Sequence, residues 1–198
     1  NWPYFVWFNW GRIELKKIMK FTPLKLPEVM LIEPDLYLDD RGYFYETYNE
    51  KIFRENVTNF FTYFVQDNNS YSNAGTIRGL HYQDKPYEQG KIIRVISGKV
   101  FDVAVDIRKN SKTYGQYVCE ILSNSNKKQL WIPPGYAHGF MALDDSTEIV
   151  YKVTNFYSKA HERTINYKDP LINIRWPEFN QDYILSQKDL NAPFLERI

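Results

Sequence analysis

Short runs in which apolar and polar residues alternate, separated by turn residues, occupy the middle of this chain. They span 91–96, 99–106, 117–122, 128–132, 139–143 and 148–154. Such alternation is typical of half-buried β-strands, because successive side chains of a strand point to opposite faces. Long helical patterns are nearly absent, and Ser97-Gly98 is a two-residue hairpin signal between the first two runs. The pattern predicts an all-β fold, either an antiparallel barrel or a jelly roll.

The flanking segments predict short peripheral elements. The stretch 24–34, with prolines at 23, 27 and 34, is predicted as an edge strand because proline cannot donate to a central ladder. Residues 39–42 predict a turn, and 43–48 and 60–67 predict two further strands. The second ends in a polar cluster at 66–70, which can offer amide groups to a ligand or close a turn. Asn49 is the expected cap of a short helix that ends near Glu55, and a short final helix is expected to begin at Ser186.

Composition fits an ordinary globular domain and argues against several functions. The 198 residues suit one domain, and no Gly/Ser-rich or Pro-rich linker divides them. The formal net charge of +1 implies neither a broad nucleic-acid surface nor a polybasic membrane surface. Residues 1–10 are aromatic, but the run is too short to span a bilayer and lacks a signal-peptide pattern. The single cysteine, Cys119, excludes an intrachain disulfide and fits a cytoplasmic location.

Three basic side chains with different chemistry lie close together in the sequence: Arg78, His81 and Lys91. An imidazole can take a proton near neutral pH, an ammonium can stabilise an enolate oxygen, and a guanidinium can contact an anion. The set suits proton transfer next to a carbonyl group. An isolated histidine is more often structural, so the basic neighbours are what favour a site here.

The alternation of side chains along a strand gives a separate test of Lys91 and of a second candidate, Tyr151. Lys91 falls on the same strand face as the apolar residues Ile93 and Val95, and Tyr151 falls on the face of the apolar positions 149 and 153. Both side chains are therefore expected to face the barrel interior. The alternatives are a lysine that escapes to solvent at the start of its strand and an ordinary core tyrosine.

Several segments occur in an order that carries a family resemblance. They read DDRGYFYE at 39–46, RGLHYQ at 78–83, QGK at 89–91, VFDVAVDIRK at 100–109, TYG at 113–115, QLWIPPGYAHGF at 129–140, YK at 151–152 and LSQKD at 185–189. From about Met19 to Asp189 the chain resembles the dTDP-4-dehydrorhamnose 3,5-epimerase family. The resemblance implies a cupin-type double-stranded β-helix, a jelly-roll barrel that forms a homodimer. It also implies an N-terminal extension at 1–18 and a single epimerase domain at 19–198.

The resemblance implies a reaction and a role for each catalytic group. The family converts dTDP-4-dehydro-6-deoxy-D-glucose to dTDP-4-dehydro-L-rhamnose by inverting C3 and C5 next to the 4-keto group. By resemblance, His81 is the base, Asp189 orients it and stabilises the imidazolium, Lys91 neutralises the developing oxyanion, and Tyr151 returns the proton from the opposite face. Asp189 has a second interpretation, as the acidic residue of a helix capping box that begins at Ser186.

Substrate contacts follow from the same resemblance. Arg41 and Arg78 are expected at the diphosphate, because a guanidinium matches phosphate oxygens with paired hydrogen bonds; a surface salt bridge is the alternative for each. The aromatic pair Phe156-Tyr157 is expected near the nucleotide base, where stacking supplies affinity. Further substrate contacts are expected from Glu46, Gln66, Asn68 and His138.

No metal or other cofactor is expected. Metal-binding cupins use an HxH pair and a glutamate, whereas His81 is followed by Gln83 here, and Lys91 lies where an acidic ligand could stand. His138 is then expected to bond the substrate or support the site, and His161-Glu162-Arg163 predicts a loop network. The alternatives are a mono-epimerase, an epimerase of another nucleotide sugar, a metal-dependent cupin oxygenase and a non-catalytic sugar-binding cupin.

Overall fold

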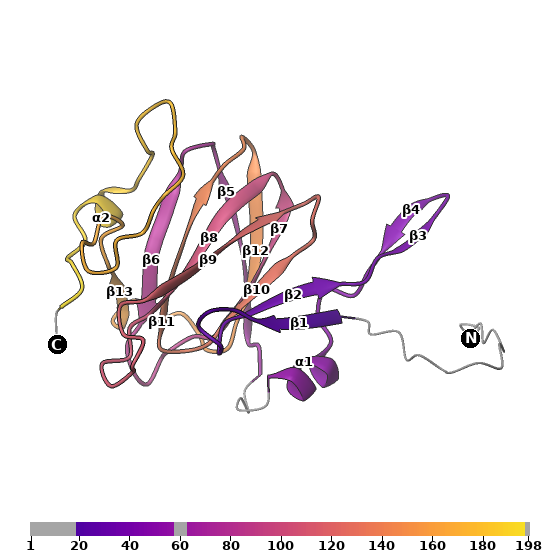
Figure 1. Ribbon diagram of the computed structural model, residues 1–198, viewed down its shortest axis with the longest axis horizontal. Helices are drawn as coiled ribbons and strands as arrows, with labels where there is room; N and C mark the ends of the chain where they lie inside the picture. Colours follow the sequence, from indigo (N-terminus) through magenta and orange to yellow (C-terminus); the bar gives the residue numbers. More distant parts are fainter. Residues whose placement is uncertain (1–18, 58–62, 197–198) are drawn as a thin grey trace.

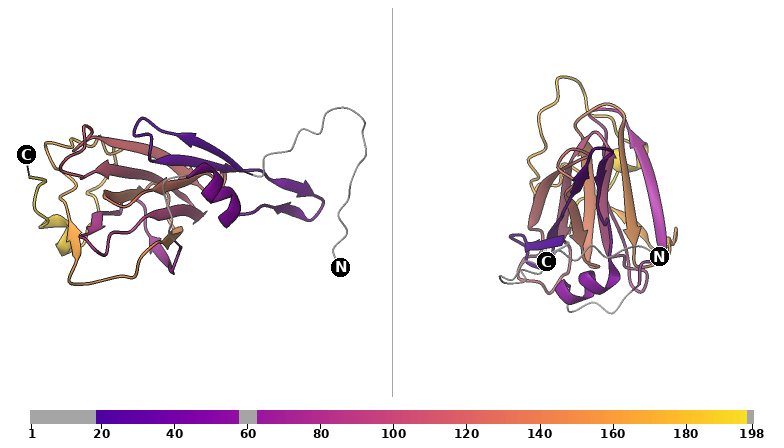
Figure 2. Two further views of the ribbon diagram at one scale, coloured as in Figure 1. Left: turned by 90° about the horizontal axis from the view of Figure 1, so that it is seen from below. Right: turned by 90° about the vertical axis from the view of Figure 1, so that its right-hand side faces the viewer.

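Two antiparallel sheets face each other and enclose the hydrophobic core (Figure 1; Figure 2). The computed structural model describes residues 19–57 and 63–196, so the expected extension at 1–18 lies outside the described residues. In order of pairing, the larger sheet contains β1 (Met19–Pro23), β2 (Met30–Pro34), β10 (Gln129–Ile132), β7 (Lys91–Ser97), β12 (Thr147–Val153) and β5 (Gln66–Ser72). The smaller sheet contains β13 (Glu162–Thr164), β6 (Ile77–Gln83), β11 (Tyr136–Ala142), β8 (Lys99–Asp106) and β9 (Tyr117–Ser123). This arrangement confirms the predicted all-β jelly roll.

Two short helices and a separate hairpin complete the described chain. The helix α1 (Glu50–Asn56) begins after Asn49, whose side-chain oxygen accepts the backbone N–H of Ile52 and so confirms the predicted cap. The helix α2 (Gln187–Leu190) begins after Ser186, also as predicted. The strands β3 (Tyr37–Asp39) and β4 (Gly42–Phe44) form a hairpin that projects from the barrel (Figure 1). In the described ranges, no helix is long and apolar enough to cross a bilayer.

The space between the sheets is filled mainly by apolar side chains. Ile93, Val95 and Ile149 from the larger sheet pack with Val100 and Ala104 from the smaller sheet. Burial of this surface, worth about 25 cal/mol per Å², holds the two sheets together. Along β7 the inward face ends in Lys91 rather than in another apolar residue, so the core gives way to a polar region at that end of the strand.

The outer face of each sheet is covered in part. On the larger sheet, α1 packs Phe53 against Trp131 with ring centroids 5.0 Å apart and ring planes at 81°. On the smaller sheet, the segment after β13 packs Ile165 and Ile172 against Leu80. Since the smaller sheet is covered on both faces, every residue of its strand β11 is buried.

The strands β7 and β8 do not form the hairpin predicted at Ser97-Gly98. β7 pairs with β10 and β12 in the larger sheet, whereas β8 pairs with β11 and β9 in the smaller sheet. Gly98 has a φ of +75°, and a Cβ atom there would collide with the side chain of Thr147. The chain therefore crosses between sheets at this glycine. A turn signal predicts a change of direction but not which sheet the next strand joins, and this explains the error.

Three other strand predictions were wrong in their bounds. Within 24–34 only β2 is a strand, and it pairs with β1 and β10, so it is not an edge strand. The prolines at 23 and 34 are instead the last residues of β1 and β2. The predicted strand 43–48 is reduced to β4. The polar cluster 66–70 belongs to β5 itself rather than to a turn after it, and residues 60–62 lie outside the described residues.

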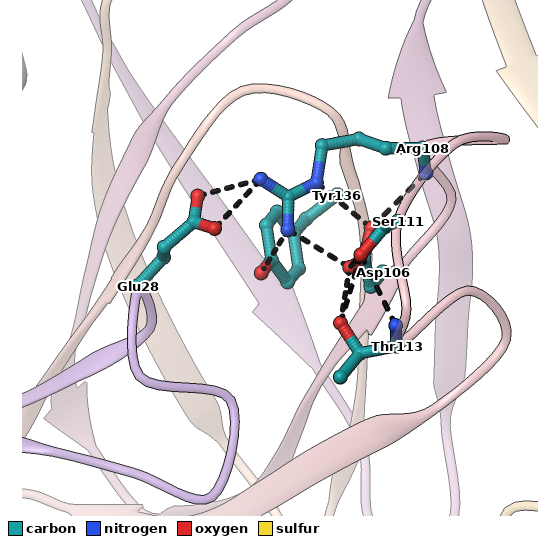
Figure 3. Close-up of polar contacts among 6 residues, drawn as sticks. All are labelled: Glu28, Asp106, Arg108, Ser111, Thr113 and Tyr136. Atoms are coloured by element: carbon teal, nitrogen blue, oxygen red, sulfur yellow. Dashed lines mark hydrogen bonds and ion pairs between the residues drawn. The ribbon is translucent and has the colours of Figure 1, made fainter.

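A buried carboxylate anchors the loop after β8. Asp106 is fully buried and accepts hydrogen bonds from the Arg108 guanidinium and from the hydroxyls of Ser111 and Thr113 (Figure 3). Burial alone would raise the pKa of Asp106, but these bonds lower it to about 2. Arg108 also pairs with Glu28, which lies between β1 and β2. The cluster therefore joins an end of the smaller sheet to the β1–β2 turn of the larger one.

Candidate active site

A cavity of about 380 Å³ opens between the two sheets. Both sheets contribute to its walls, and the chain segments before β7 and after β12 complete its rim. The lining residues from the larger sheet are Gln66, Asn68, Ser70, Lys91 and Tyr151; those from the smaller sheet are Arg78, His81, Tyr82, Gln83, His138, Phe140 and Glu162; those from the rim are Gln89 and Tyr157.

His81 and Asp189 form a hydrogen-bonded pair across 108 residues of sequence. The Nε2 atom of His81 lies 2.7 Å from Oδ1 of Asp189. Burial would raise the pKa of Asp189, but hydrogen bonds from His81 and from the backbone of Gly79 hold it below its usual range. The ionised carboxylate favours the proton on Nε2, which leaves Nδ1 as the basic nitrogen of the ring. Asp189 also donates its backbone N–H to the hydroxyl oxygen of Ser186, the N-cap of α2, so the capped first turn of this helix holds Asp189 beside His81.

Lys91 carries its ammonium group into the cavity, as strand parity predicted. The residue is only 7% exposed, and its Nζ atom donates to the backbone oxygen of His81 at 3.4 Å. Burial lowers the pKa of Lys91 from 10.5 to about 8, against the opposing effect of the Asp102 and Glu162 carboxylates. The side chain is therefore still mainly protonated at neutral pH. It offers a positive charge in a place with little water to screen it.

Tyr151 lies on β12, the strand next to β7, and also faces the cavity as predicted. Burial raises the pKa of its phenol, and Arg78 opposes that shift. The hydroxyl therefore stays protonated and is available as a proton donor. Tyr151 and Lys91 come from the larger sheet, whereas His81 comes from the smaller one. The basic nitrogen and the phenol thus belong to opposing walls.

A second histidine–aspartate pair lies beside the first. The pairing of β11 with β6 puts His138 directly opposite His81. Its Nε2 atom lies 3.0 and 3.1 Å from the two carboxylate oxygens of the fully buried Asp102. Burial lowers the pKa of His138 although Asp102 opposes that shift, so the ring is a neutral hydrogen-bonding group. This geometry suits the substrate-bonding or supporting role expected for His138.

Two glycines allow these strands to approach closely beside the histidines. Gly79 has a φ of +123°, and a Cβ atom there would lie 2.6 Å from the Cα atom of Gly139. The pairing of β11 and β6 shifts register between His138 and Phe140. A side chain at either glycine would therefore push apart the two strands that carry His81 and His138.

Besides His138, four predicted substrate contacts lie on the cavity wall or rim: Gln66, Asn68, Arg78 and Tyr157. The polar strand β5 supplies Gln66 and Asn68, whose alternation with exposed residues follows the strand period. Arg78 is held by Ser72 and by the backbone oxygen of Tyr71, at 3.0 and 2.7 Å. Phe156 is 61% exposed and does not line the cavity.

The structure does not bring Arg41 and Glu46 to this cavity within one chain. Arg41 lies in the tight turn between β3 and β4, and it pairs with Asp39 at 2.5 Å. Figure 1 shows that hairpin at the end of the molecule away from α2 and the C-terminus. Glu46 accepts a hydrogen bond from Asn49 at the start of α1.

Two acidic groups of the site were not selected from the sequence. Asp102 shares its strand face with Val100 and Ala104, so the parity argument applied to Lys91 would also have found it. Glu162 was predicted only as part of a loop network, whereas it begins β13, lines the cavity and accepts hydrogen bonds from Lys188 at 2.6 Å and from the Tyr157 hydroxyl at 3.2 Å. Over the ranges that the structure describes, no three His, Cys, Asp or Glu side chains are grouped to hold a metal.

The fold and the site together define an acid–base isomerase on a cupin-type barrel. The barrel places a histidine hydrogen-bonded to an aspartate, a buried ammonium and a phenol around one cavity. The chain belongs to the dTDP-4-dehydrorhamnose 3,5-epimerase family, whose model matches residues 23–197. This confirms the family resemblance and the enzyme class inferred from the sequence.

Known relatives match nearly the whole of the described barrel. The dTDP-4-dehydrorhamnose 3,5-epimerase of Shigella flexneri is 52% identical over 174 residues, which are 88% of this chain and 94% of the relative. The structure of dTDP-6-deoxy-D-glucose-3,5-epimerase from Legionella pneumophila Philadelphia 1, in complex with dTDP-4-keto-L-rhamnose, has a TM-score of 0.86 and 45% identity, covering 89% of this chain and 93% of that one. A 3'-monoepimerase from Streptomyces bikiniensis in complex with dTDP-quinovose has a TM-score of 0.81 and 31% identity, covering 87% and 86%. The barrel alone therefore does not determine which carbons are inverted.

Proposed function

We propose that this enzyme converts dTDP-4-dehydro-6-deoxy-D-glucose to dTDP-4-dehydro-L-rhamnose by inverting C3 and C5. The observation that carries the proposal is the placement of His81 and Tyr151 on opposing walls of one cavity, with the ammonium of Lys91 in the same cavity. Inversion at carbon needs a base on one face and a proton donor on the other. Family membership and the named ligands of the structural relatives support the nucleotide-sugar substrate.

Each inversion requires one proton to leave and one to arrive. The 4-keto group makes the neighbouring C–H bond acidic, so His81 takes the proton and the bonding electrons move to the C4 oxygen as an enolate. The ammonium of Lys91 stabilises that oxygen, and its low exposure strengthens the interaction. Tyr151 then protonates the carbon from the opposite face and restores the ketone. Exchange with water returns both groups to their starting states, and the sequence repeats at the second carbon.

The protonation states in the cavity suit this order of events. Asp189, ionised and hydrogen-bonded to Nε2, stabilises the imidazolium that forms when His81 accepts a proton. The raised pKa of Tyr151 keeps its phenol protonated until it is used. No step requires a redox cofactor or a metal, because the keto group already present in the substrate acidifies both carbons.

The nucleotide is proposed to lie along the rim of the cavity. Arg78 presents its guanidinium at the cavity wall, where it suits a diphosphate, and Tyr157 offers an exposed ring for the base. Gln66 and Asn68 line the same cavity, and Phe156 adds a second exposed ring next to Tyr157 in the sequence.

We also propose that the enzyme is a homodimer in which the β3–β4 hairpin of one subunit reaches the cavity of the other. Leu38 and Phe44 on that hairpin are 77% and 68% exposed, which suits burial against a second copy. Arg41 and Glu46 would then contact the substrate held by the partner. Residues 19–198 are proposed to form the single domain, and the cytoplasm is the proposed location.

Complementation between inactive variants tests the shared site. Arg41→Ala and His81→Asn subunits are mixed after each has been measured alone. A mixed dimer has one cavity with an intact His81 from one chain and an intact Arg41 from the other. Activity that returns on mixing supports the proposal, whereas two variants that stay inactive in a demonstrated mixed dimer place Arg41 outside the partner's cavity.

Proton NMR in deuterated water tests the reaction itself. With the wild-type enzyme, both C3 and C5 of the 4-keto sugar should exchange and invert; exchange at one carbon alone would identify a mono-epimerase. Tyr151→Phe should still allow exchange but little inversion, and His81→Asn should stop both, with a rate loss of about a hundredfold to ten-thousandfold. Inversion by Tyr151→Phe at the wild-type rate would reduce Tyr151 to a core residue, and normal exchange by His81→Asn would refute the assignment of the base.

A further inference from the structure

The loop 154–161 crosses the mouth of the cavity from the larger sheet to the smaller one. It leaves β12 and enters β13, and it carries the exposed rings of Phe156 and Tyr157. Tyr157 is 54% exposed, so packing by its neighbours does little to fix its ring. The Tyr157 hydroxyl donates to Glu162 at 3.2 Å, and the position of the ring otherwise depends on how the backbone beneath it is held.

Gln83, the last residue of β6, holds this backbone from the smaller sheet. The residue is 5% exposed, and its Nε2 atom donates to the backbone oxygens of Tyr87 and Phe156 at 2.6 and 3.2 Å. Its Oε1 atom accepts the backbone N–H of Ser158 at 2.7 Å. One buried amide thus joins the end of β6 to two separate rim segments, those before β7 and after β12.

Gln66 holds the same loop from the larger sheet. Its Oε1 atom accepts the backbone N–H of Tyr157 at 3.1 Å, and its Nε2 atom donates to Asn68 at 2.8 Å. Gln66 and Gln83 together therefore bind three consecutive residues of the loop through backbone atoms, one amide from each sheet. We call these two side chains the amide clamp.

We infer that Gln83 is a positioning residue that sets nucleotide affinity by fixing the ring of Tyr157, without taking part in proton transfer. The inference rests on the proposed stacking role of Tyr157. An amide suits this position because it donates two hydrogen bonds and accepts one in the same plane, which matches two carbonyl oxygens and one N–H. An apolar side chain of similar size would leave all three backbone groups without their partner, and the loop would move to recover water.

The first experiment compares dTDP binding with turnover in Gln83→Leu. Calorimetry should show dTDP binding weakened by about tenfold or more, the scale of one or two lost hydrogen bonds. The turnover rate at saturating nucleotide sugar should stay within about twofold of wild type, because the loop 154–161 carries neither His81 nor Tyr151, the two residues proposed to move protons. Gln116→Leu is the matched control, since Gln116 is exposed and lies outside the cavity lining. Equal losses of turnover and affinity, or unchanged affinity, would overturn the inference.

A double-mutant cycle shows whether Gln83 acts through Tyr157. Tyr157→Ala should weaken dTDP binding, and adding Gln83→Leu to it should cause little further loss. Independent, multiplying losses would overturn the positioning role. If Tyr157→Ala weakens binding and Gln83→Leu does not, the clamp is wrong while the stacking proposal stands. If Tyr157→Ala itself has no effect on dTDP binding, the stacking role fails and the inference fails with it. The proposed reaction is tested separately, by solvent exchange at the sugar carbons.

A second variant covers the case in which Gln83→Leu does not fold. Gln83→Glu keeps the side-chain shape and can still accept from Ser158, but as a carboxylate it faces the oxygens of Tyr87 and Phe156 without a donor. Protonation restores one donor. The dTDP affinity of Gln83→Glu, divided by that of the wild type at the same pH, should therefore rise as the pH falls. If this affinity ratio does not change with pH, the result counts against the amide clamp.

Discussion

Replacing Lys91 by methionine is expected to stabilise the protein while removing its activity. Lys91 is 7% exposed. Its Nζ atom lies 3.4 Å from the backbone oxygen of His81, which is its one hydrogen-bond partner among the described residues. An ammonium with so few partners raises the free energy of the folded state. Methionine keeps the length of the side chain and removes the charge.

The size of the gain follows from the pKa of Lys91. The pKa of Lys91 falls from 10.5 to about 8 on folding. At neutral pH this shift corresponds to a loss of roughly 3 kcal/mol from the free energy of unfolding. Burial is the largest cause, and the attraction of Asp102 and Glu162 is already included in the shift. Those carboxylates lose a counter-charge in the variant, so the expected net gain is about 1–3 kcal/mol. Turnover should fall by at least about a hundredfold, because the enolate oxygen loses its stabilising charge.

The pH dependence gives the sharper test. The folded state of the wild type releases its proton from Lys91 near pH 8, whereas the unfolded chain keeps it to about pH 10.5. The unfolded state therefore binds more protons between these values, so this group makes wild-type stability rise with pH across that window. The Met variant lacks this rise, and its advantage should shrink as the pH approaches 10.5.

Denaturant unfolding near neutral pH and near pH 10.5 measures the effect. Lys152→Met is the matched control, because Lys152 lies on the neighbouring strand but pairs outside the cavity with Asp67 at 3.0 Å. That control should change stability by less than about 1 kcal/mol at both pH values. A Lys91→Met protein that is less stable than wild type at neutral pH, or whose advantage does not depend on pH, would refute the reasoning.

Three further changes test other parts of the molecule. Asp106→Asn should lower the free energy of unfolding, measured by urea denaturation, by about 3 kcal/mol. The reason is that Arg108 and two hydroxyls lose their charged acceptor (Figure 3). Since the pKa of Asp106 is depressed from 3.8 to about 2, the wild-type advantage should hold above pH 3.8 and fade toward pH 2; a difference that does not change over this range would contradict the assignment. Arg78→Ala should weaken dTDP binding by about tenfold to a hundredfold in calorimetry, and unchanged binding would remove Arg78 from the phosphate site. Chelators should leave turnover intact, and a loss restored by one divalent ion would show that a metal is required.

The sequence predicted features that depend on strand period and local turns. The inward direction of Lys91 and Tyr151 followed from alternation alone, because a strand leaves only two faces to choose between. The same rule applied to Asp102 would have added the second histidine–aspartate pair. The caps at Asn49 and Ser186 were equally local, since each needs only a short polar side chain before the first helical turn.

Features that depend on distant pairing were not available from the sequence. Gly98 marks a change of direction, but the sheet joined by β8 is decided by contacts with β9 and β11. The polar cluster 66–70 left a ligand contact and a turn as alternatives, because strands are usually recognised by their apolar residues. Here the inward side of β5 faces a polar cavity instead of the core, so its pattern is polar throughout. The bond between His81 and Asp189 needed the family resemblance, since no local pattern links residues so far apart.

The same burial that disfavours the charged form of the Lys91 side chain also makes that charge useful to the proposed reaction. Water around an exposed ammonium would screen its charge, whereas in the cavity the charge acts on the enolate oxygen at lower effective dielectric. The carboxylates of Asp102 and Glu162 raise the pKa of Lys91 enough to keep the ammonium mainly protonated at neutral pH. Asp102 therefore serves two cavity groups at once, because it also holds His138. Because these charges are coupled, removing any single one of them should alter the protonation of its neighbours.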